Sequence, residues 1–322
     1  MRMITVGEND AGQRLDKFLC KLMPACPKGL LYKLIRKKDI RLNGARCTGR
    51  EQLCPGDTVR IFAPEECFSR KQTVPDGAAL PLAILYEDAQ VLIVNKPKGM
   101  DVHSGSRSGA PTLLAGVQQY LIRSGAYDPA HEQTFSPALC NRIDRNTQGL
   151  VIAAKTAAAL RAINELIRER CIVKCYLAVT SAPLPRKADT CTAWLKRDGT
   201  TVTVADEKRG PDWKEIRTQY RVIARSGDLC LAAVTLHTGR THQIRAHLAH
   251  LHAPLLGDPK YGRARGHEEN QCLCAYALRF PADLPEPLSA LSGRTVTAPL
   301  PAFVGHYFPE VTQETIYSAL SR

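Results

Sequence analysis

Strand-like segments follow one another between residues 172 and 236, and this succession constrains the fold more than any other feature. Each segment is short, apolar or alternating, and bounded by turn residues; they cover residues 172–180, 190–195, 201–205, 217–224 and 229–236. Helical patterns stand apart from them, at 112–123 and 157–170. Successive strands with segregated helices are typical of an α+β domain with a mixed, largely antiparallel sheet, and they disfavour a doubly wound parallel sheet.

Positive charge is concentrated near the amino terminus. The 322 residues include 44 Lys and Arg against 31 Asp and Glu, a net charge of +13, and residues 1–63 alone hold 13 basic and 6 acidic residues. Within 28–36 the apolar residues recur at helical spacing, so the basic side chains fall on the opposite face of a short helix. Such a face can neutralise phosphates, and the predicted RNA-binding residues are Lys33, Arg36, Lys37, Lys38 and Arg41.

The amino-terminal segment has an ordered series of motifs. RLDKFL begins a helix at residues 14–22, the basic helix follows, and Asn43-Gly44 and Pro55-Gly56-Asp57 mark tight turns. This unit resembles the alpha-L RNA-binding domain first recognised in a ribosomal small-subunit protein. We predict an RNA-binding domain at 1–63, a Pro- and Gly-containing linker at 64–80, and a catalytic domain at 81–322.

Several common kinds of site are missing from the sequence. It has no phosphate loop, dinucleotide-binding turn, zinc-protease helix or serine nucleophile elbow, and its twelve cysteines form no CxxC. His242 and His247 are five residues apart and would diverge on a helix. We therefore expect no metal, no nucleotide cofactor and no membrane association. The start of the chain lacks the apolar core of a secretory signal, so we expect a cytoplasmic protein with reduced thiols. We also expect a monomer.

Residues 141–150, NRIDRNTQGL, place one carboxylate, Asp144, between Arg142 and Arg145. Cationic neighbours favour an ionised carboxylate, and a loop beside a buried strand is a common place for functional residues. Taken alone, the motif favours a structural Asp–Arg ion pair at the start of a strand.

Further segments favour the functional interpretation. They are residues 84–105, 174–179 (KCYLAV) and 236–262, which contains GRTHQIRAHL. Together with residues 141–150 they make four segments. In their order along the chain, the four segments resemble those of the pseudouridine synthases of the ribosomal large-subunit type, often called the RluA type, over most of residues 82–310. The resemblance implies an RNA-modifying isomerase that acts most often on ribosomal RNA, with transfer RNA as another possible substrate.

The resemblance also implies roles for single residues. Asp144 matches the essential aspartate, Tyr176 the aromatic residue that packs on the uracil, and Arg245 the arginine that pairs with the carboxylate. Arg142 matches the arginine that helps to extrude the target nucleotide. The turn that builds the pocket wall matches Arg240, Thr241, His242 and Gln243, and the motif at Lys96 and Pro97 is expected to be largely structural.

The sequence departs from the usual pattern beside the aspartate. Asn141 stands where a histidine is common, Ile143 replaces leucine, and Gln148 replaces serine. These changes put contacts made by the usual histidine and serine in doubt, and with them the identity of the substrate.

The chemistry suits these residue types. Isomerisation breaks the bond from nitrogen to the sugar, turns the uracil and rejoins it through carbon, with no oxidation and no group lost. An ionised carboxylate can attack the sugar or the base, or abstract a sugar proton, and the sequence does not decide among them. A glycosidase usually needs two facing carboxylates. The alternatives left open are a catalytically silent RNA-binding or ribosome-assembly protein and an RNA N-glycosidase.

Overall fold

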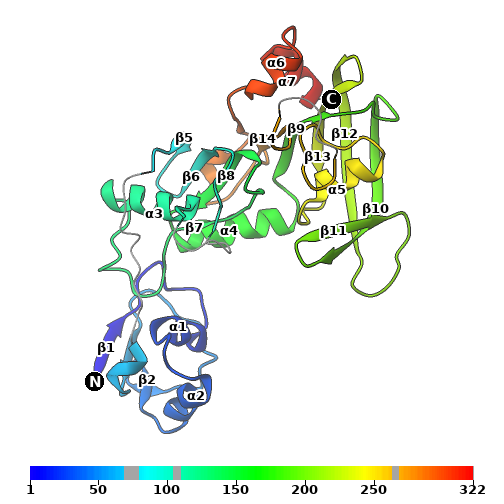
Figure 1. Cartoon of the computed structure of the whole chain (residues 1–322). Coiled ribbons are helices and arrows are strands. Elements are labelled where there is room, and N and C mark those ends of the chain that lie inside the picture. Colours follow the sequence, from blue (N-terminus) through cyan, green and yellow to red (C-terminus); the bar gives the residue numbers. More distant parts are fainter. Residues whose placement is uncertain (69–79, 104–109, 263–267, 322) are drawn as a thin grey trace.

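The structure, a computed structural model, describes residues 1–68, 80–103, 110–262 and 268–321. It contains two separate sheets, a small one near the amino terminus and a large one that carries the rest of the chain (Figure 1). Among the described helices, none combines the length and the apolar character that crossing a membrane requires.

The small sheet has the strand order β1-β4-β2-β3. Its strands are β1 (Arg2–Thr5), β2 (Ile40–Leu42), β3 (Ala45–Arg46) and β4 (Thr58–Ile61). Helices α1 (Leu15–Leu22) and α2 (Lys28–Arg36) bury their apolar faces in the same core as the sheet. Asn43 and Gly44 both have positive φ, 49° and 76°, as expected for the two-residue turn between β2 and β3. The helices and the turn predicted from the sequence are all present.

The predicted linker, residues 64–80, lies mostly outside the described residues. Its first part forms a 3-10 helix, η1 (Glu65–Phe68), in which Cys67 and Phe68 are buried in the amino-terminal core. The exact boundaries of the two domains stay a prediction.

The large sheet is mixed and mostly antiparallel, as the sequence predicts. Its order is β11-β10-β12-β13-β9-β14-β8-β6-β5, with β15 beside β14 and β7 beside β8. The strands are β5 (Ala83–Glu87), β6 (Val91–Lys96), β7 (Ala138–Leu139), β8 (Gln148–Ala154), β9 (Val173–Thr180), β10 (Ala188–Asp198), β11 (Thr201–Ala205), β12 (Lys214–Ser226), β13 (Leu229–Leu236), β14 (Leu273–Arg279) and β15 (Thr295–Thr297). Strands β10 and β12 are longer than predicted because polar residues continue both strands beyond their apolar centres.

Helices cover both faces of this sheet, so the central strands are buried on both sides. On one face lie α3 (Leu113–Arg123) and α5 (Gln243–His250). On the other lie α4 (Ala157–Arg168), α6 (Ala302–Tyr307) and α7 (Gln313–Ser321), and a short 3-10 helix, η2 (Ser289–Leu291), joins the same core. Helix α4 ends two residues before the predicted position, and Arg170 beyond it has a positive φ of 63°.

Strand β14 connects the two halves of the large sheet. It pairs antiparallel with β9 along most of its length, but parallel with β8 at only two positions, Cys274 with Gln148 and Ala275 with Gly149. Gly149 has a φ of 119°, and a Cβ there would meet backbone atoms of Ala275. Only glycine therefore lets β8 come close to β14 at this point.

The amino-terminal domain contacts the start of α4. The side chain of Asn9 accepts a hydrogen bond from the backbone N–H of Ala157 (2.9 Å) and donates one to Glu132 (2.6 Å). Arg161, one turn further along α4, donates to the carbonyl of Ala11 (3.2 Å). Polar contacts from one face of the small domain therefore fix the amino-terminal end of α4.

Candidate active site

Asp144 lies in the turn between β7 and β8. The turn is closed by the backbone N–H of Thr147, which donates to the carbonyl of Asp144 (3.0 Å). Lys96, fully buried at the end of β6, donates to the carbonyls of Pro97, Met100 and Arg145 at 2.8–2.9 Å. Burial lowers the pKa of Lys96 to about 8, so the ammonium is still the main form at pH 7 and can donate all three bonds. Lys96 therefore holds the turn that presents Asp144.

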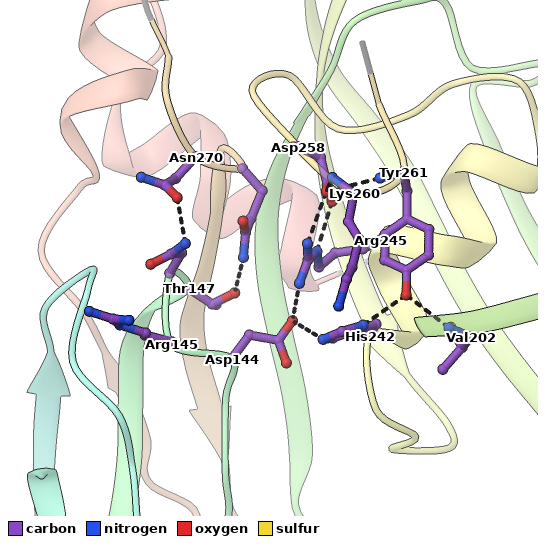
Figure 2. Close-up of polar contacts among 12 residues, drawn as sticks. Asp144, Arg145, Thr147, Val202, His242, Arg245, Asp258, Lys260, Tyr261 and Asn270 are labelled. Atoms are coloured by element: carbon purple, nitrogen blue, oxygen red, sulfur yellow. Dashed lines mark hydrogen bonds and ion pairs between the residues drawn. The ribbon is translucent and has the colours of Figure 1, made fainter. Parts of the chain in front are cut away.

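Arg245 contacts the Asp144 carboxylate from α5. Its Nη1 donates to Oδ2 of Asp144 at 2.9 Å (Figure 2). The side chain of Asp144 is 26 % exposed, whereas that of Arg245 is only 8 % exposed. One oxygen of the carboxylate is thus held by a buried cation, while the group remains open to a bound molecule.

A second carboxylate, Asp258, holds Arg245 from behind. Nε and Nη2 of Arg245 donate to its two oxygens at 2.7 and 2.9 Å, and the Asp258 side chain is fully buried. The backbone N–H groups of Lys260 and Tyr261 also donate to Asp258 (2.9 and 3.2 Å). Burial alone would raise the pKa of Asp258, but the bonds and charge of Arg245 lower it below its usual value. This two-bond contact fixes the plane of the guanidinium.

His242 approaches the same oxygen of Asp144 that Arg245 holds. Its Nε2 is 3.9 Å from Asp144 Oδ2, and its Nδ1 is 2.8 Å from the hydroxyl of Tyr261. That hydroxyl accepts the N–H of Val202 at 3.1 Å, so its proton is available for Nδ1 of His242 (Figure 2). Burial lowers the pKa of His242, which favours the neutral ring, and its Nε2 faces Asp144.

Tyr176 forms an apolar wall of the site. It lies in β9 between Val234 of β13 and Ala275 of β14, and only 8 % of it is exposed. Burial and the nearby Asp144 raise the pKa of its phenol. Tyr176 is therefore a neutral ring at pH 7, which suits it better for packing than for accepting a proton.

Most of the predicted site residues line one cavity of about 280 Å³. It brings together Asp144, Tyr176 and Arg245 with Arg142, Arg240 and His242, from segments far apart in the sequence. Arg142 and Arg240 are exposed at its rim. Thr241 also belongs to the lining.

Gln243 does not reach this cavity. Its carbonyl oxygen accepts from Thr238 Oγ1 (2.9 Å) and from the Arg240 N–H (3.0 Å), and its amide donates to Arg217 and Thr218 (3.2 and 3.0 Å). Because these contacts use both ends of the amide, Gln243 supports the turn from inside the protein. The expected substrate contact is not part of this arrangement.

The residues that depart from the common motif have structural contacts. The side chain of Asn141 accepts from the N–H of Ile152 (2.8 Å) and donates to the carbonyl of Leu150 (3.3 Å). Ile143 is buried in the core below α3 and α5. Asn141 thus ties the loop to β8, and neither residue removes Asp144 from the cavity.

The predicted RNA-binding residues of the amino-terminal domain lie on and after α2. Lys33, Arg36, Lys37 and Lys38 are exposed, and Arg41 at the start of the hairpin is half-buried. The apolar residues between them, Leu31, Leu34 and Ile35, face the core. The basic side chains of α2 and of the two residues after it are therefore open to solvent, away from the core.

The histidines near α5 have separate polar partners. His247 is buried against Thr218 Oγ1 (2.9 Å), and His250 contacts Asp206 (2.8 Å). Within the described residues, no three His, Cys, Asp or Glu side chains are placed to hold a metal ion.

The sequence interpretation missed Asp258 and Tyr261. Both lie in GDPKYG, within residues 236–262, but nothing in their spacing shows that they return to Arg245 and His242. It also missed Lys174, which lines the cavity two residues before Tyr176. A lysine in a strand usually points to solvent, so only the structure shows that Lys174 lines the cavity.

Comparisons with known proteins agree with this geometry. A sequence model described as RNA pseudouridylate synthase matches residues 90–250, and one for the S4 domain matches residues 13–59. The chain belongs to the RNA pseudouridylate synthase family. It is an RNA pseudouridine synthase with an amino-terminal S4 domain, as the motifs predict.

Related proteins resemble the synthase along most of its length. It is 32 % identical over 291 residues to a ribosomal large subunit pseudouridine synthase C of Yersinia pestis, covering 87 % of this chain and 88 % of the relative. It is 31 % identical over 260 residues to a ribosomal large subunit pseudouridine synthase D of Nitrosomonas europaea, covering 81 % and 72 %. Among solved structures, human RNA pseudouridylate synthase domain containing 4 superposes with a TM-score of 0.58 at 23 % identity, covering 70 % of this chain and 92 % of that one. This last likeness supports the fold.

Proposed function

We propose that the synthase converts specific uridines of large-subunit ribosomal RNA to pseudouridine, with Asp144 as the catalytic group. The observation that carries the proposal is the contact of Asp144 with buried Arg245 in a cavity walled by Tyr176. The relatives named for the large ribosomal subunit support the choice of RNA. Transfer RNA is the alternative substrate.

Asp144 supplies the one reactive carboxylate that isomerisation needs. Its Oδ2 is held by Arg245, so the other oxygen is the one directed to substrate. In this position the carboxylate attacks the nucleotide or abstracts a sugar proton, and the bond from nitrogen to the sugar breaks. Asp258 faces only Arg245 and the backbone, so it is a positioning residue and not a second acid or base.

Tyr176 retains the uracil after it leaves the sugar. A flat ring against the base keeps it in the cavity while it turns and presents carbon 5. Because the phenol stays neutral at pH 7, its main role is packing. Arg240 and His242 line the same cavity.

Arg142 assists extrusion of the target nucleotide. It is exposed at the rim of the cavity, and its planar guanidinium can stack where the extruded base has been. Extrusion costs a few kcal/mol, and phosphate contacts from the S4 domain, through Lys33, Arg36, Lys37, Lys38 and Arg41, offset this cost. We further propose that the synthase works as a monomer in the cytoplasm, a state that light scattering of the purified protein would test.

The test is tritium release from ribosomal RNA labelled at carbon 5 of uracil. The wild type should release tritium, and Asp144→Asn should release at least a thousandfold less. Asp198→Asn is the matched control, because Asp198 lies in the exposed hairpin between β10 and β11, and its rate should equal that of wild type. Full release by Asp144→Asn would refute the catalytic role. Free uracil among the products would indicate an N-glycosidase, and release from transfer RNA alone would correct the substrate.

A further inference from the structure

The active-site cavity continues into two neighbouring cavities. A second cavity, of about 240 Å³, shares Lys174, Leu236 and Arg240 with it. A third, of about 390 Å³, shares Arg170, Leu236 and His237 with the second. Because neighbouring cavities have lining residues in common, they lie next to one another in a row that starts beside Asp144, and we call this row the groove.

Among the residues that the structure describes, only basic side chains provide charge along the second and third cavities. Arg170, Lys174 and Arg240 line the nearer part, and Arg221 and Arg279 line the farther part. His237 lies between the two parts, and burial lowers the pKa of its ring, so it is not counted as a cation. Within the described part of the chain, no Asp or Glu side chain lines either cavity. Arg168 also borders the groove, but Glu165 and Glu169 pair with it.

The groove passes around the ends of β9 and β13 to the other face of the sheet. Tyr176 belongs to the core beneath α3 and α5, whereas Cys175 belongs to the opposite core. Arg279 contacts the sulfur of Cys175 on that opposite side (3.8 Å), and residues 319 and 320 of α7 close the far end. The path therefore leads away from the face that holds Asp144, and it is separate from the basic side chains of α2 in the S4 domain.

We propose that this groove binds the phosphodiester backbone of the RNA strand that flanks the target uridine. The inference rests on the proposed function, because the strand must enter at the cavity that takes the nucleotide. A chain of phosphates fits a groove that has cations along its length and, among the described residues, no acidic side chain. The extruded base anchors one nucleotide, and the groove holds its neighbours in single-stranded form.

The test removes two cations that lie outside the active-site cavity. Arg170→Gln and Arg221→Gln are combined, and the control combines Arg123→Gln and Arg225→Gln, which are exposed and line none of the three cavities. Both variants lose the same charge. The probe is a fragment of large-subunit ribosomal RNA with a mapped pseudouridine site, prepared with and without six further nucleotides on each side.

The wild type should bind the longer fragment more tightly than the shorter one. In Arg170→Gln/Arg221→Gln this advantage should fall about tenfold, and the slope of log K against log salt should decrease by about 1.4, or roughly 0.7 for each lost contact with a single strand. KM should rise with little change in kcat. The control should behave as wild type.

Several results would overturn the groove. The first is that Arg170→Gln/Arg221→Gln keeps the wild-type preference for the longer fragment and the wild-type salt slope. The second is that the control variant loses as much RNA affinity as this variant. The third is that a polyglutamate peptide competes for the protein as well as RNA does, which would favour an acidic protein partner. A wild type that forms no pseudouridine would refute the proposed function instead. RNA binding by the same fragments would still report on the groove, so the two failures are distinguishable.

Discussion

Replacement of Asp258 by Asn tests whether this buried carboxylate positions Arg245 for catalysis. Asp258 is fully buried and holds Arg245 by two hydrogen bonds. Asparagine has the same shape and keeps one acceptor oxygen, but it has no charge. The change therefore removes the counter-ion without opening a cavity.

The cost follows from the contacts. Breaking a buried ion pair by removing one partner costs about 3–5 kcal/mol. The retained oxygen still accepts one bond from a charged donor, which offsets about 1.5 kcal/mol. We expect the free energy of unfolding of Asp258→Asn to fall by about 2.5 kcal/mol at pH 7. Loss of the fixed guanidinium plane should also displace Arg245 from Asp144 and lower kcat/KM about a hundredfold.

The pH dependence gives a second, independent signature. The folded state lowers the pKa of Asp258, so its contribution to stability is present above the unfolded value of about 3.9 and is lost as pH falls through the folded value. The difference in stability between wild type and variant should therefore be full at pH 7 and shrink below about pH 4.

Urea unfolding of both proteins between pH 3 and pH 7, together with tritium release at pH 7, provides the measurement. Asp198→Asn is the control, because its exposed pair with Lys196 (3.4 Å) is worth less than about 1 kcal/mol. An Asp258→Asn protein with wild-type stability and wild-type turnover would refute the positioning role. A stability difference between wild type and Asp258→Asn that is the same at every pH would refute the electrostatic explanation of the effect.

Three further changes test other parts of the synthase. Tyr176→Phe should slow tritium release less than tenfold and Tyr176→Ala at least a hundredfold, since packing is the main role of the ring; an equal loss in both would instead support proton relay. Lys96→Met should lower the free energy of unfolding by about 3 kcal/mol, because three buried carbonyls lose their donor, and a loss below 1 kcal/mol in urea unfolding would contradict this account. Combined Lys33→Ala, Arg36→Ala and Lys37→Ala should weaken RNA binding and reduce the slope of log K against log salt by about 2–3. Fluorescence anisotropy at several salt concentrations measures both quantities. An unchanged slope would mean that these three residues of the α2 region do not contact RNA.

The sequence predicts the fold class well because local patterns decide it. Apolar periodicity marks α4 and β9, and Asn43-Gly44 fixes a hairpin by turn geometry alone. The lengths of β10 and β12 were underestimated, because their outer residues are polar and are held by cross-strand pairing. Pairing depends on a neighbour that local sequence does not identify.

The site was predicted in part for the same reason. Asp144, Tyr176 and Arg245 lie in distinctive motifs, and the structure brings them to one cavity. The motif around Gln243 is equally distinctive, yet its side chain points into the protein, because orientation within a turn depends on partners such as Thr218. For Asp258 the opposite holds. Nothing in the sequence around it marks it as important, and only the folded structure shows its contact with Arg245.

The place of β14 in the sheet has a consequence for how the synthase is made. This strand, residues 273–279, lies between β9 and β8 and so joins the half of the sheet that carries Asp144 to the half that carries Arg245. During synthesis it emerges after nearly all the rest of the chain. The S4 domain, with its own sheet and core, can fold long before that moment. A nascent chain could therefore hold RNA well before it could modify any, and the order of translation would separate binding from catalysis in time.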